Sequence, residues 1–158
     1  MPKSKTLLAL ILCFTVTGAA HAATGPVTYK VIYSGGSLPA VKGGEAMRLQ
    51  LNSASLTLWF KKEGIIAIPA AAITEVSYGQ EVHRRVGTAI GLAVVSFGIG
   101  AMMLLAKSKK HYIGLTWDDE GKKGGAALQA DKNEYRGLIM ALEGISGKKA
   151  VNTDPPAK

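Results

Sequence analysis

The sequence predicts a mainly β fold that ends in one α-helix and is interrupted by one hydrophobic helical membrane segment. Short runs in which apolar and polar residues alternate recur between turn residues, as is typical of strands with one buried face. Near the C-terminus the spacing changes, and Tyr135, Leu138 and Leu142 follow the three- to four-residue spacing of an amphipathic helix. Residues 86–106, in contrast, contain no charged side chain.

Residues 1–22 have the features of a secretory signal peptide. Two lysines precede a short apolar run, and small side chains follow at Ala20 and Ala22. We expect cleavage after Ala22 or Ala23, and an uncleaved N-terminal anchor is the alternative. The single cysteine, Cys13, lies within this peptide, so the mature chain is expected to contain no disulfide.

Alternation predicts seven strands between the signal peptide and the C-terminal helix. Gly64 closes a hairpin turn, Pro69 ends the next strand because it lacks a backbone donor, and residues 70–72 form a corner. Asp118 opens a further turn that runs to Gly125. The expected strands cover residues 27–33, 47–51, 56–60, 65–68, 73–78, 111–117 and 126–130.

The C-terminal helix is expected over residues 135–145. Asp131 precedes it as a cap, and Glu134 lies three residues later, as in a capping box. Gly147 suits the C-terminal end of the helix. Residues 148–158 are polar and contain two prolines, so we expect a disordered tail.

Residues 86–106 are long and apolar enough to match the hydrocarbon core of a bilayer, which takes roughly 20 apolar residues. A buried helix of a soluble core is the alternative, although such helices seldom run this long without a charge. The segment residues of interest are Val86, Gly87, Gly91, Phe97, Gly98, Gly100 and Leu104. The flanking residues, whose cationic side chains can reach the headgroups, are His83, Arg84, Arg85, Lys107, Lys109, Lys110 and His111.

Three stretches resemble the bacterial pleckstrin-homology-like and GRAM-like domains. They read MRLQLNSASLTLWF (residues 47–60), IIAIPAAAITEVSYG (residues 65–79) and HYIGLTWDDEGKKGGAALQADKNEYRGLIMALEGISG (residues 111–147). The resemblance implies a small, partly open antiparallel barrel closed at one end by the helix, and it implies binding of lipid headgroups or proteins. The basic loop that eukaryotic relatives use for phosphoinositides is not evident, because residues 34–44 offer only Lys42.

The apolar segment divides this domain into a first part, residues 23–85, and a second part, residues 107–147. Each part is too short to bury a sufficient core alone. If the two parts form one barrel, the segment must return to the same side of the membrane, and we expect a hairpin that turns near Phe97 and Gly100. A single span is the alternative, with the basic residues after it held on the cytoplasmic side.

Few residues suggest chemistry. Gly87 and Gly91 form a small-xxx-small pair through which two membrane helices can approach, either within a homo-oligomer or against a protein partner, or they are flexible filler. His83 and His111 flank the segment but are too few for a zinc site. No nucleophile, phosphate-binding or dinucleotide-binding motif is present, so no catalytic residue, metal or cofactor is expected.

The net charge of +8, from 19 Lys and Arg against 11 Asp and Glu, is scattered without interleaved aromatic residues, so nucleic acid is not expected as a partner. The sequence therefore predicts a non-enzymatic binding or scaffold module attached to the bilayer. Its β domain would lie on the periplasmic side of the inner membrane. The alternatives are a single-span accessory subunit of a membrane complex and, from a different class, a soluble periplasmic enzyme.

Overall fold

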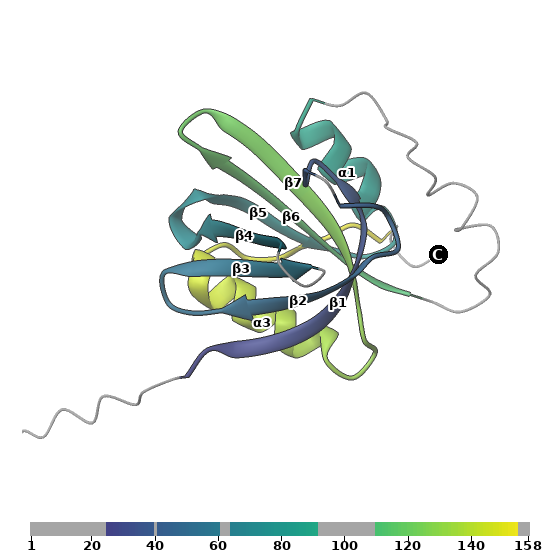
Figure 1. Ribbon diagram of the computed structural model, residues 1–158. Coiled ribbons are helices and arrows are strands. Elements are labelled where there is room, and N and C mark those ends of the chain that lie inside the picture. The colour runs from purple at the N-terminus through teal and green to yellow at the C-terminus, as the bar shows by residue number, and fades with distance from the viewer. Residues whose placement is uncertain (1–24, 40, 61–63, 92–109, 155–158) are drawn as a thin grey trace, which may run out of the picture.

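The computed structural model describes residues 25–39, 41–60, 64–91 and 110–154, which form one eight-stranded sheet with two α-helices (Figure 1). The strands lie in the order β4-β3-β2-β1-β7-β6-β5-β8, and only β5 and β8 pair in parallel. The prediction of a mainly β fold with a C-terminal helix is confirmed. The elements are β1 (Val27–Gly36), β2 (Ala46–Leu51), β3 (Ser55–Phe60), β4 (Gly64–Pro69), the 3-10 turn η1 (Ala70–Ala72), β5 (Ile73–Tyr78), α1 (Val82–Ala89), β6 (His111–Asp119), β7 (Lys122–Ala130), α3 (Tyr135–Ser146) and β8 (Val151–Asn152).

Strand β1 joins the two halves of the sheet. Residues 27–32 pair with β2, whereas the end of the strand pairs with β7. The register shifts between Tyr33 and Gly35, and such a bulge bends a strand and increases its twist. The strands before and after residues 92–109 therefore belong to one sheet.

The inner face of the sheet packs on α3. Leu138 and Leu142 are fully buried, with 0% of their surface exposed, so the predicted apolar stripe of this helix is confirmed. The strand side chains of the same core include Val31, Leu49, Leu58, Ile73, Val76, Ile113, Leu115 and Leu128.

The ends of α3 match the predicted capping only in part. Glu134 occupies the N-cap without a side-chain capping bond. Asp131 instead accepts the amide of Asn133 at 2.8 Å, while its backbone carbonyl accepts the amide of Tyr135 at 2.9 Å. The capping box is wrong because a separate turn over these residues already uses the aspartate. Gly147 ends the helix in the left-handed conformation, with φ at 65°, as predicted.

Helix α1 covers the outer face of β6 and β7, opposite to the face on which α3 packs (Figure 1). Val82 and Val86 are 0% and 2% exposed and pack against Tyr112 and Ala127, with Ile90 at the margin of this cluster. Because both faces are covered, β6 and β7 are buried along consecutive residues rather than at every second one.

The prediction of a transmembrane helix beginning at Val86 is wrong. Val86 is buried in the fold, α1 has only eight residues, and Gly91 has a left-handed φ of 70°. Among the described residues, no helix combines the length and the hydropathy needed to cross a bilayer. Val82, Val86 and Ile90 recur every four residues, so they form the buried stripe of a helix that starts before the uncharged run. Residues 92–106 lie outside the described residues.

The chain after α3 also differs from the prediction. Val151 and Asn152 form β8 beside β5, and the amide of Thr153 donates to the carbonyl of Tyr78 at 2.8 Å. This part of the predicted disordered tail is therefore ordered. Strand β7 begins at Lys122 rather than at residue 126, because the β6–β7 hairpin continues to a tight turn at Gly121.

Candidate functional site

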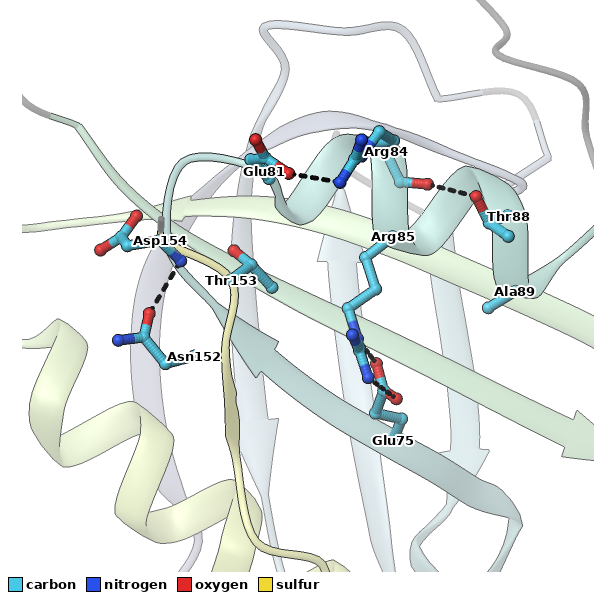
Figure 2. A pocket seen from close by; sticks show the side chains of 9 residues that line it. All are labelled: Glu75, Glu81, Arg84, Arg85, Thr88, Ala89, Asn152, Thr153 and Asp154. Atoms are coloured by element: carbon cyan, nitrogen blue, oxygen red, sulfur yellow. Dashed lines mark hydrogen bonds and ion pairs between the residues drawn. The ribbon is translucent and has the colours of Figure 1, made fainter. Parts of the chain in front are cut away.

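Three of the predicted membrane-flanking residues lie on α1. Arg85 donates two hydrogen bonds to Glu75 of β5, at 2.6 and 2.8 Å. Arg84 forms an ion pair with Glu81 at 2.7 Å. Figure 2 shows that Arg85 reaches from the helix towards the sheet, whereas Arg84 stays on the outer side of the helix. The first of these pairs therefore ties α1 to β5.

A hollow of about 640 Å³ lies between α1 and the C-terminal strand (Figure 2). Besides the two ion pairs, it contains one further carboxylate, Asp154, whose Oδ1 accepts the backbone amide of Gln80 at 2.7 Å. All the charged groups of this hollow are thus engaged with the protein itself. The hollow fits a structural role, since it holds α1 and β8 against β5, better than it fits a site for a charged ligand.

His83 is the third flanking residue on α1, and it packs edge-on against Tyr112 with 4.7 Å between the ring centroids. Both ring nitrogens are buried, and within the described part of the chain neither has a hydrogen-bond partner. Burial without a partner disfavours the charged imidazolium and lowers the pKa of His83 below its ordinary value of 6.5. The docked helix therefore holds this histidine in its neutral form.

This arrangement predicts a pH-dependent stability. The unfolded chain takes up a proton on His83 near pH 6.5, whereas the folded chain resists it, so the unfolded state binds more protons below that pH. The free energy of unfolding should fall as the pH decreases from about 7 and level off below the folded-state pKa. Urea unfolding at several pH values checks this, and the His83→Leu variant should lose this part of the pH dependence. Parallel curves for both proteins would contradict it.

The remaining predicted site residues do not form one cluster. His111 stacks on Tyr135 of α3, with centroids 4.0 Å apart. Tyr112, which contacts His83, is the next residue of β6. Because successive strand residues face opposite sides, His111 and Tyr112 lie on opposite faces of the sheet.

The other predicted site residues are scattered. Gly87 is half-buried on α1, whereas Gly91 lies beyond the end of this helix. Lys110 immediately precedes β6, and its carbonyl accepts the side-chain amide of Gln80 at 2.8 Å. Phe97, Gly98, Gly100, Leu104, Lys107 and Lys109 lie outside the described residues.

No metal site is evident in the described parts of the chain, where no three His, Cys, Asp or Glu side chains gather. The turn that begins at Asp118 uses its carboxylate internally, because Oδ1 accepts the amide of Gly121 at 2.9 Å. The acidic turn is thus a tight hairpin.

The outer face of β1–β4 carries the second candidate site. Lys30, Arg48, Trp59 and Ile65 stand opposite one another on four successive strands, and we call these four residues the outer row. Trp59 is 39% exposed and Ile65 is 52% exposed, and both cations are exposed as well. Exposed apolar side chains that are rimmed by polar groups are a feature of interaction surfaces. Alternation in the sequence separated Lys30 and Arg48 from the apolar face but assigned no face to Ile65, and the strand register was needed to bring the four residues together.

Lys30 and Arg48 are directly opposed cations. Like charges in this cross-strand position destabilise a sheet. Within the described part of the chain, neither cation forms an ion pair with a carboxylate. Asp131 follows Ala130, which pairs with Val31, so one carboxylate stands beside Lys30 and offsets part of this repulsion, and an anionic ligand would offset the rest.

A hollow of about 430 Å³ adjoins the outer row. Its lining includes Lys30, Ile32, Arg48, Trp59, Gln129 and Asp131. Ile32 is 38% exposed and adds apolar surface to this hollow. The site thus combines two cations, a carboxylate, an indole and an aliphatic side chain in one recess.

Comparison with known proteins adds no assignment to this geometry. The chain matches no protein-family model, and no curated protein sequence is similar to it.

Proposed function

We propose that this chain is a non-catalytic binding module of the pleckstrin-homology-like kind and that the outer row is its docking face. The mainly antiparallel sheet and the C-terminal helix packed on its inner face support this proposal, because the sequence resemblance implies an antiparallel β domain covered by such a helix. The observation that carries the proposal is the cross-strand pair of Lys30 and Arg48 beside the exposed Trp59, with no ion pair to either cation among the residues that the structure describes. Helix α1 covers the outer face of β6 and β7, so the outer face of β1–β4 is the part open to a partner.

The proposal includes export and attachment to the periplasmic side of the inner membrane. Val86 is buried in the fold, and the structure describes this part of the chain up to Gly91. Of the uncharged run, residues 92–106 are therefore the part that is left for attachment to the membrane. A spanning helix takes about 20 residues, and this run is shorter than that. Shallow attachment through residues 92–106 keeps both halves of the sheet on one side of the bilayer, as the shared β1 requires.

Fractionation of bacterial cells that express the full chain with a C-terminal tag tests this attachment. We expect the chain in carbonate-washed membranes, and we expect protease to remove the tag in spheroplasts. Replacing Val95 and Ile99 by aspartate should move the protein to the soluble periplasmic fraction, because burying a carboxylate in the bilayer is costly.

The matched control places the same two charges on the described surface. Ser53 and Met140 are exposed, so Ser53→Asp with Met140→Asp should leave the protein in the membrane fraction. An unaltered chain recovered in the soluble periplasmic fraction would contradict the proposal.

A further inference from the structure

We propose that the outer row binds an extended acidic segment of a partner protein, an inference that rests on the proposed binding function. Lys30 and Arg48 lie side by side in register, at a Cβ separation of about 5 Å for opposed strand residues. Two cations at this spacing can hold one carboxylate between them or two carboxylates on alternate residues of an extended peptide. The carboxylates would relieve the repulsion between the two cations.

The apolar part of the site fits side chains that alternate with those carboxylates. Trp59 stands next to Arg48 in register, and Ile65 stands next to Trp59, so an apolar surface continues the row towards the sheet edge at β4. Ile32 adds an apolar wall to the hollow. The volume of the hollow, about 430 Å³, falls within the ~300–1,000 Å³ typical of ligand pockets.

The shape and charge of the recess favour a peptide over a membrane surface. The cations share their hollow with Asp131, which the β1–β7 register places beside Lys30, and one oxygen of this aspartate is already held by the amide of Asn133. An anionic bilayer would contact this carboxylate as well as the cations, and the carboxylate would repel the anionic headgroups. A peptide can place its acidic residues at Lys30 and Arg48 and a neutral residue at Asp131.

Selection of peptides from a random phage library on the mature chain, held in phosphatidylcholine nanodiscs, tests the inference. We expect the enriched peptides to alternate Asp or Glu with apolar residues. The affinity of the best peptide, measured by fluorescence anisotropy, should fall roughly tenfold or more in Arg48→Gln, since a charge-assisted hydrogen bond contributes about that much. Lys30→Gln should act in the same direction, and replacing the peptide's acidic residues by their amides should reproduce the loss.

Lys148→Gln with Lys149→Gln is the matched control, because these exposed lysines follow α3 and lie outside the outer row. It should leave the affinity unchanged. Enriched peptides without acidic residues, or equal losses in the control, would overturn the inference. A third outcome would also overturn the inference. In it, no acidic peptide binds, the protein prefers phosphatidylglycerol to phosphatidylcholine vesicles, and Lys30→Gln and Arg48→Gln remove this preference. Membrane attachment is measured separately by fractionation, so its failure leaves the peptide result interpretable.

Discussion

Replacing Gly114 by alanine is expected to destabilise the protein by about 1–3 kcal/mol and to loosen α1. A Cβ at Gly114 would lie 2.8 Å from Val82 Cγ1 and 2.9 Å from Val86 Cγ2, and it would also press on Ser77 Oγ. Both valines are buried, so they cannot rotate into open space. Urea unfolding measures the loss of stability, and hydrogen exchange of the α1 amides measures the loosening of the helix.

The same substitution at Gly144 is the control, and its expected sign is opposite. Gly144 lies within α3, and a Cβ added there meets no atom within 4 Å. Alanine should therefore stabilise the helix by up to about 1 kcal/mol. If Gly114→Ala retained full stability and full protection of α1, the close packing of this helix on β6 would be contradicted.

Replacing Leu138 by alanine is expected to have the largest effect on stability. Leu138 is 0% exposed in the core between α3 and the sheet. Removal of a buried leucine side chain costs about 2–5 kcal/mol, because apolar contacts are lost and a cavity remains. The midpoint of urea-induced unfolding should decrease accordingly, with an unchanged slope.

Met140 supplies the matched control on the same helix. It is 70% exposed, so Met140→Ala should change the free energy of unfolding by no more than about 0.5 kcal/mol. A similar effect of both substitutions would contradict the orientation of α3 on the inner face.

The sequence predicted the strands and α3 well because each has one buried and one exposed face. Residues 135–145 and the Leu138 and Leu142 stripe agree with the structure. Helix α1 was missed because its polar half, with Arg84 and Arg85, read as a membrane flank and its apolar half read as part of the uncharged run. The spacing of apolar residues along the chain cannot distinguish an apolar helix face that packs on a sheet from the beginning of an apolar segment that faces lipid.

The candidate site was predictable only in part for a related reason. Alternation shows that Arg48 and Trp59 point away from the core. Their adjacency, and the pairing of Arg48 with Lys30, depend on strand register. The neutral state of His83 likewise depends on contacts with Tyr112 from a distant strand.

The pairing of β1 with β7 has a consequence for the order in which the sheet forms. Ser37, just after this strand, donates its backbone amide to the carbonyl of Gly125, and the two residues are separated by 88 positions. Contacts of such long sequence separation slow folding because a large loop must close first. A chain that is synthesised from its N-terminus thus exposes the β7-pairing edge of β1 long before β7 is made, so the sheet can be completed only when synthesis is nearly finished.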